Sequence, residues 1–204
     1  RSAGSRWVES VPTVVDLQQF GEPRQANASQ EVVVGWIGSP ATAHYLKMIS
    51  GVVAELAGMA KVRCIAIGAR ADQVSGTIFE PVRWSKEQEA ALLRSIDIGV
   101  MPLPDAPWEH GKCGFKLIQS MAAGVPVVAS PVGVNSQIVR QGENGALAST
   151  PREWFEALRD LATDADKRQE FGAEGRRGVE GWYALSVQAP RLAMILEKTA
   201  RRLH

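Results

Sequence analysis

The sequence predicts an α/β fold, a doubly wound parallel sheet of about six strands with helices on both faces and a helical C-terminus. Short β-branched runs that end at glycine alternate with segments whose apolar residues recur every three or four positions. Such alternation is typical of a parallel sheet whose strands are joined by helices. In the last third of the chain only the helical period remains, and 204 residues are enough for one domain of this class with a sizeable core.

The first β-α-β unit is the clearest element of the pattern. Residues 31–37 (EVVVGWI) are short, β-branched and followed by Gly38, which indicates a buried parallel strand. From about residue 43 to 59 the spacing of apolar residues indicates an amphipathic helix. The apolar run 62–67 closes at Gly68 and completes a unit long enough for a right-handed crossover.

The same alternation continues to the end of the chain. Pro151 and Thr150 stand where the first turn and the cap of a helix tolerate them. The later predicted elements are strands at 78–82, 98–103 and 125–130 and helices at 86–95, 114–123, 153–161, 167–177 and 187–202.

Residues 1–30 carry little periodicity and are predicted to be a connection that leads into one domain, residues 31–204. The segment opens with a polar stretch, has an apolar run at 11–15 and then turns rich in Gln, Ala and Asn. The first residue is Arg1 and not Met, so we expect the chain to be cut from a longer protein.

Composition excludes several classes of protein. With 45% hydrophobic and 22% charged residues, the chain is neither a disordered segment nor a disulfide scaffold, and Cys64 and Cys113 are expected to be free thiols. A formal net charge of +1 gives no overall field for nucleic acid or an anionic membrane. No run approaches the roughly 18 to 20 apolar residues of a spanning helix. Any anion site must therefore be local.

The first candidate site is the turn after the first strand. Gly38 and Ser39 precede the predicted helix, so backbone N–H groups and the helix N-terminus could form a seat for a phosphate. A tight strand-to-helix turn that binds no ligand explains the same residues equally well.

The loop 105–116 (DAPWEHGKCGFK) is a stronger candidate, because it follows a strand and opens a helix. Lys112 and Lys116 are four residues apart, so on a helix both ammonium groups would reach one side near its positive end. Gly111 and Gly114 favour close approach of a ligand, and a solvated basic turn is the alternative.

The remaining motifs give weaker evidence for a binding site. The turn at 130–135 could offer backbone amides or be structural, and no histidine shares a metal-ligand spacing with a cysteine, so no metal site is expected. Trp36, Trp84 and Trp108 stand at strand ends, where one could stack on a nucleotide base, although packing is the commoner role of tryptophan there.

Four segments, PTVVDLQQF (12–20), GWIGSPATAHYL (35–46), residues 97–135 and GENGALAST (142–150), strongly resemble the retaining glycosyltransferases of family 4, the GT-B group 1 enzymes. The resemblance runs from about Pro12 to the end and is most specific in 97–135. It implies that residues 31–204 are the Rossmann-like domain that binds a nucleotide-sugar donor, one half of a GT-B fold. The N-terminal acceptor domain would be missing.

The sequence departs from the usual signature of that family, a pair of glutamates in the donor loop. Aligned on Met121 to Val128, the first acid falls at Lys112 and the second at Gln119, where the resemblance implies contacts to the donor sugar and the ribose. Asp105 or Glu109 could replace the lost acid. The resulting assignment is Gly38, Ser39, Lys112 and Lys116 for the diphosphate; Asp105, Glu109, Gly114, Phe115 and Gln119 for the sugar or ribose; and Trp84 for the base, with the catalytic residues unassigned.

The resemblance implies a retaining, metal-independent transfer of a hexose from a nucleotide-diphosphate sugar to a polysaccharide or glycolipid, with no cofactor and no nucleic-acid partner. We expect this chain alone to be inactive, since the acceptor domain is absent, and the protein to be cytoplasmic or peripheral at the inner membrane face. A nucleotide-sugar 2-epimerase and a non-catalytic nucleotide-binding module are the alternatives.

Overall fold

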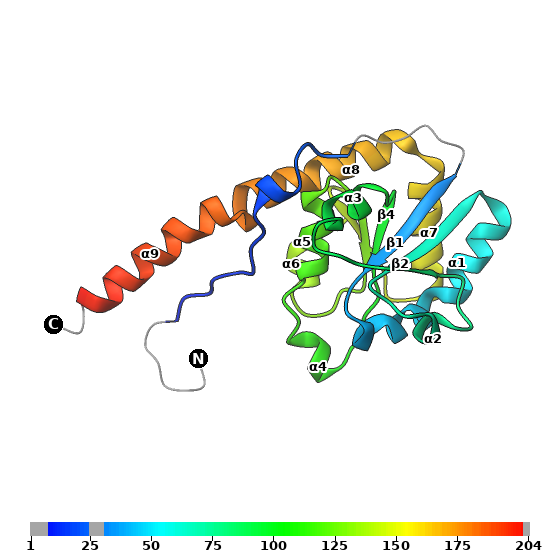
Figure 1. Ribbon diagram of the computed structural model, residues 1–204, viewed down its shortest axis with the longest axis horizontal. Helices are drawn as coiled ribbons and strands as arrows, with labels where there is room; N and C mark the ends of the chain where they lie inside the picture. Colours follow the sequence, from blue (N-terminus) through cyan, green and yellow to red (C-terminus); the bar gives the residue numbers. More distant parts are fainter. Residues whose placement is uncertain (1–7, 25–30, 202–204) are drawn as a thin grey trace.

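Six parallel strands form the centre of the molecule, in the order β3-β2-β1-β4-β5-β6 (Figure 1). The computed structural model describes residues 8–24 and 31–201. The order reverses between β1 and β4, and ligands of open α/β sheets bind at the carboxyl ends of strands at such a point. The strands are β1 Val32–Ile37, β2 Val62–Ile67, β3 Glu80–Val82, β4 Ile98–Met101, β5 Val127–Ala129 and β6 Gly145–Leu147.

The sheet has helices on both faces, which confirms the predicted class. Along β1, Val34 and Trp36 pack into one core cluster, while Val33 and Ile37 face the other. The first cluster is closed by α1 and α7, and the second by α3 and α5 (Figure 1). The longer helices are α1 Lys47–Met59, α3 Glu89–Arg94, α5 Phe115–Ala122, α7 Pro151–Thr163, α8 Ala165–Gly178 and α9 Leu185–Arg201.

Helix boundaries follow local chemistry. The predicted helix 43–59 begins earlier than expected, as the 3₁₀ turn η2 (Pro40–Leu46), because Pro40 suits a first turn. The expected cap of α7 is confirmed, since Thr150 Oγ1 accepts from the N–H of Glu153 and the Glu153 carboxylate accepts from the N–H of Thr150. The other elements are α2 Ala71–Val74, α4 Pro107–His110, α6 Asn135–Ile138, the 3₁₀ turn η1 Leu17–Gln19 and the π-helical turn η3 Val179–Tyr183.

The described part of the lead-in segment, residues 8–24, lies against the domain and beside the start of α9 (Figure 1). The N–H of Val15 donates to the carbonyl of Tyr183, and the N–H of Leu185 donates to the carbonyl of Val15. Phe20 is buried in the core. These contacts join residues that the sequence places at opposite ends of the chain.

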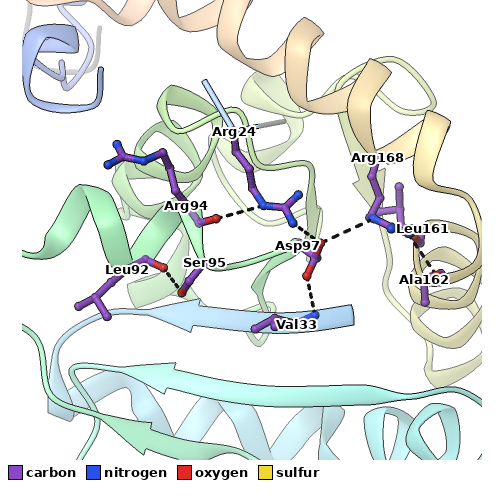
Figure 2. Close-up of polar contacts among 9 residues, drawn as sticks. All are labelled: Arg24, Val33, Leu92, Arg94, Ser95, Asp97, Leu161, Ala162 and Arg168. Carbon is purple, nitrogen blue, oxygen red and sulfur yellow. Dashed lines mark hydrogen bonds and ion pairs between the residues drawn. The ribbon is translucent and has the colours of Figure 1, made fainter. Parts of the chain in front are cut away.

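A buried ion cluster fastens this segment to the amino-terminal edge of the sheet (Figure 2). Asp97, which is 3% exposed, pairs with Arg24 and accepts a hydrogen bond from the N–H of Val33 at 2.8 Å. Arg168 of α8 approaches the same carboxylate at 4.0 Å and donates to the carbonyl of Leu161. One carboxylate therefore links the lead-in segment, β1 and α8.

Gly172 marks the closest packing of α8 on the body of the domain. A Cβ atom there would lie 2.1 Å from the carbonyl oxygen of Gly124, which is backbone and cannot swing away. We expect Gly172→Ala to lower the free energy of unfolding by about 1–3 kcal/mol, because an added methyl would force the helix outward. Urea unfolding followed by circular dichroism measures the change.

Gly178 is the matched control in the same helix. A Cβ atom there meets nothing within 4 Å, so Gly178→Ala should leave stability unchanged or raise it by up to about 1 kcal/mol. Equal effects of the two substitutions would contradict the packing argument.

Candidate functional site

A pocket of about 710 Å³ lies at the carboxyl ends of β1, β2 and β3, beside the point where the strand order reverses. Ile37 at the end of β1 and residues 38–40, 68–70 and 83–84, which follow the three strands, form part of its wall. Helices α3 and α5 complete it. The pocket therefore lies at the edge of the sheet where the sequence predicts a site.

Six of the ten assigned residues line this pocket: Gly38, Ser39, Trp84, Phe115, Lys116 and Gln119. The other four, Asp105, Glu109, Lys112 and Gly114, lie outside its lining.

Lys116 is a half-buried cation in the lining of the pocket. Its Nζ donates to Thr42 Oγ1 at 2.9 Å and lies 4.4 Å from the centre of the Trp36 ring. No acidic side chain in the described part of the chain pairs with it. Burial, and secondarily the positive charge of Lys112, lowers the pKa of Lys116 to about 8. The sequence did not single out Thr42 for this role.

Gly38 contributes space to the site. Its N–H donates to the carbonyl of Ile67 at 3.0 Å, so this amide is already engaged and does not supply the free donor that the sequence argument assumed. A Cβ atom at Gly38 would lie 2.5 Å from Lys116 Nζ and 2.5 Å from the Trp36 ring. Glycine is therefore required so that the ammonium group can lie against the turn.

The expectation that Lys112 and Lys116 share one helix face is wrong. Helix α5 starts at Phe115, and Gly114 before it has φ 68°, a left-handed conformation that interrupts a continuous helix. Lys112 lies in the preceding loop, with Nζ 5.7 Å from the centre of the Tyr45 ring. It lines a second cavity of about 630 Å³, together with Cys113 and other residues.

Neither of the two acids considered as replacements lines the pocket. Glu109 is buried and accepts a hydrogen bond from the hydroxyl of Tyr45, which raises the pKa of Tyr45 to about 12. Asp105 is exposed and pairs with His110 at 2.6 Å. The Glu109–Tyr45 contact holds α4 against η2, whereas the Asp105–His110 pair lies within α4 and the loop before it.

The acid that does line the pocket is Glu89, at the start of α3. Its two carboxylate oxygens accept hydrogen bonds from Gln119 Nε2 at 2.9 Å and from Trp84 Nε1 at 2.8 Å. Arg83 is a further cation in the lining. Sequence reasoning missed both: Arg83 directly follows a predicted strand, which was a usable signal, but Glu89 belongs to no motif.

In residues 8–24 and 31–201, no group of three or more His, Cys, Asp or Glu side chains could hold a metal ion. In the same part of the chain, no helix combines the length and the apolar character needed to cross a membrane.

Curated relatives match about half of the chain. A D-inositol 3-phosphate glycosyltransferase of Paenarthrobacter aurescens is 33% identical over 112 residues, which are 52% of this chain and 26% of that protein. A phosphatidyl-myo-inositol mannosyltransferase of Mycobacterium leprae is 31% identical over 133 residues, 62% of this chain and 34% of that protein. Spore coat protein SA of Bacillus subtilis is 30% identical over 83 residues, 39% of this chain and 22% of that protein.

Solved structures share the fold over nearly the whole chain. HepE from Anabaena, in a complex with UDP and glucose, has a TM-score of 0.73 at 16% identity. The match covers 96% of this chain and 59% of the HepE chain. Sucrose-phosphate synthase from Thermosynechococcus elongatus has a TM-score of 0.73 at 16% identity, and the match covers 94% of this chain and 52% of the other. The chain thus spans little more than half of these neighbours.

The domain therefore has the fold of one part of the GT-B glycosyltransferases, with a parallel six-stranded sheet and a pocket at its carboxyl edge. The family of sequences described as glycosyl transferases group 1 matches residues 31–164, well over half of the chain. This chain is therefore a member of the glycosyl transferases group 1 family.

Proposed function

We propose that this chain is the donor-binding half of a glycosyltransferase and that its pocket holds the diphosphate of a nucleotide-sugar donor. The observation that carries the proposal is Lys116, a half-buried ammonium group that lines the pocket and hydrogen-bonds to a neutral hydroxyl. Removing a cation from water is costly unless an anion lies beside it. A diphosphate next to Ser39 and Lys116 would supply that anion.

The rest of the lining supports a nucleotide as the ligand. Trp84 is 46% exposed and Phe115 is 38% exposed, so both offer aromatic surface to a planar base. A volume of about 710 Å³ falls within the usual range of small-ligand pockets, about 300–1,000 Å³. Arg83 and Arg70, the latter paired with Asp72, add further positive charge to the lining.

The reaction that we propose is a retaining, metal-independent transfer of a hexose to a polysaccharide or glycolipid acceptor. As the glycosidic bond breaks, the leaving diphosphate gains negative charge, and a fixed ammonium group stabilises that charge without moving. The hexose and glycolipid parts are supported by the relatives that are named as a mannosyltransferase and as inositol phosphate glycosyltransferases.

We also propose that acceptor binding requires a further domain, because the chain covers 59% of HepE and 52% of the synthase. These 204 residues would then bind a donor without transferring its sugar.

A thermal-shift panel tests the donor site. UDP, GDP and ADP are each added to the chain, with the corresponding monophosphates and inorganic phosphate as controls. At least one diphosphate should raise the Tm, and by more than its monophosphate does. The shift should be measurable, because a ligand at 100 times its Kd stabilises the folded state by about 2.7 kcal/mol. UDP is the first choice because HepE was solved with it. No shift with any diphosphate would contradict the proposal.

Affinity for the diphosphate should fall as the pH rises through the pKa of Lys116, about 8. Binding requires the charged ammonium group, which is mostly protonated at pH 7 and mostly neutral at pH 9. We expect the Kd to be about tenfold weaker at pH 9 than at pH 7. Calorimetric titration at both values measures the ratio. Lys116→Arg, which keeps its charge at both values, should remove the pH dependence; an unchanged ratio in that variant would assign it to another group.

A further inference from the structure

Glu89 joins two walls of the pocket. One carboxylate oxygen accepts from Gln119 Nε2 on α5, and the other accepts from Trp84 Nε1 on the loop after β3. Gln119 lies 30 residues further along the chain, and its side chain is buried with 6% of the residue exposed. Among the described residues that line the pocket, Glu89 is the one carboxylate.

A carboxylate would repel a phosphate, so Glu89 does not suit a site that binds phosphate groups alone. Arg83 and Lys116 line the same pocket, yet neither forms an ion pair with Glu89 in the described part of the chain. An ionised carboxylate has about four lone-pair positions, and two of those on Glu89 are used. The remaining positions call for hydrogen-bond donors. A ligand group with hydroxyl or N–H donors therefore suits the position beside Glu89, and a phosphate there would be repelled.

The contact also fixes the orientation of the Gln119 amide. Because Nε2 uses one of its two N–H groups on Glu89, the carbonyl oxygen Oε1 is placed as the acceptor that remains for a ligand. No described residue donates a hydrogen bond to that oxygen, and it is not among the sealed, unpaired polar atoms of the interior. Glu89 and Gln119 together present two neighbouring acceptors to the pocket, which match two neighbouring hydroxyl donors.

We propose that Glu89 and Gln119 together bind the two ribose hydroxyls of the nucleotide, and that Glu89 also positions the amide of Gln119 and the ring of Trp84. The inference rests on the proposed function, because it takes the ligand to be a nucleoside diphosphate. What it adds to that function is the role of Glu89. The fold brings this carboxylate to the Gln119 amide from a different helix.

Paired ribo and deoxyribo ligands test the assignment. Calorimetric titration at pH 7 compares UDP with 2′-deoxy-UDP, and GDP with 2′-deoxy-GDP. The wild-type chain should bind the ribo form about tenfold or more tightly than the deoxy form, since the deoxy form leaves a charged acceptor without its donor. Glu89→Gln should reduce this ratio to about twofold, while its affinity for the deoxy form changes less than its affinity for the ribo form.

An exchange of the two side chains separates recognition from folding. Gln119→Glu alone places two carboxylates against each other and should weaken binding of the ribo form. The double variant Glu89→Gln/Gln119→Glu restores one carboxylate and one amide, and it should recover most of the ribo-to-deoxy ratio. Glu87→Gln, an exposed position outside the pocket, is the control and should keep the wild-type ratio.

Two results would overturn the inference while the proposed function stands. The wild-type chain could bind a nucleoside diphosphate with equal affinity for both sugars, or Glu89→Gln could keep the full ratio with its fold intact by circular dichroism. If the wild-type chain binds none of the nucleoside diphosphates, the proposed function fails and the assignment of Glu89 fails with it.

Discussion

Replacing Lys116 with methionine should weaken the binding of nucleoside diphosphates by about 10- to 100-fold at pH 7. Methionine keeps an apolar side chain over the Trp36 ring and removes the ammonium group that we assign to the diphosphate, with its hydrogen bond to Thr42. A hydrogen bond to a charged group contributes about 1.5–3 kcal/mol, which corresponds to this range of affinities. Calorimetric titration of the wild-type chain and the variant with the best ligand of the panel measures the loss.

Two further lysine variants make this result specific. Lys47→Met removes the same charge from an exposed position at the start of α1, outside the pocket, and should leave the Kd unchanged. Lys112→Met removes a charge near the pocket but not in its lining, so its effect should be smaller than that of Lys116→Met. An effect of Lys112→Met as large as that of Lys116→Met would return Lys112 to the diphosphate site.

Replacing Asp97 with asparagine should lower the free energy of unfolding by about 3–5 kcal/mol, the usual loss when one partner of a buried ion pair is removed. The substitution leaves Arg24 and the buried Arg168 without their shared counter-charge (Figure 2). A small domain has only about 5–15 kcal/mol of stability in total, so the variant should be much easier to unfold. Urea unfolding followed by tryptophan fluorescence measures the difference.

The surface pair of Arg70 and Asp72 provides the matched control. Asp72→Asn removes a carboxylate of an exposed pair at 3.2 Å, where water screens the two charges, so the free energy of unfolding should change little. If Asp97→Asn costs no more than Asp72→Asn, the buried cluster does not hold the lead-in segment to the domain.

The sequence predicts the sheet well because its strands are buried on both faces. Continuous β-branched runs such as 32–37 and 62–67 have few other interpretations in a chain of this composition. Strand β6, Gly145–Leu147, was not among the predicted strands, because three residues without a β-branched side chain carry no pattern. The four-residue helices α2, α4 and α6 are missed for the same reason, since each is little longer than one helical turn.

The site is predicted in outline because strand ends of a parallel sheet meet at one edge. This rule brought Ser39 and Lys116 to the same pocket without any knowledge of distances. The rule fails where loop conformation decides, as at Lys112, whose position depends on the left-handed Gly114. It also cannot find Glu89, whose partner is 30 residues away and depends on how α3 packs beside α5.

The lead-in segment shows another limit of local patterns. Residues 1–30 are predicted as a connection, a division that stays a prediction, and residues 1–7 and 25–30 lie outside the described chain. The described part nevertheless reaches the core through Phe20 and the ion cluster through Arg24. No periodicity in the sequence signals such contacts, because each joins residues about 70 positions or more apart.

A crystal structure of the chain with the nucleoside diphosphate that gives the largest thermal shift tests the central claim most directly. We predict that phosphate oxygens lie within hydrogen-bond distance of Lys116 Nζ, and that the base lies against Trp84 in the pocket at the carboxyl ends of β1, β2 and β3. A nucleotide bound instead in the second cavity, beside Lys112 and Cys113, would contradict the account.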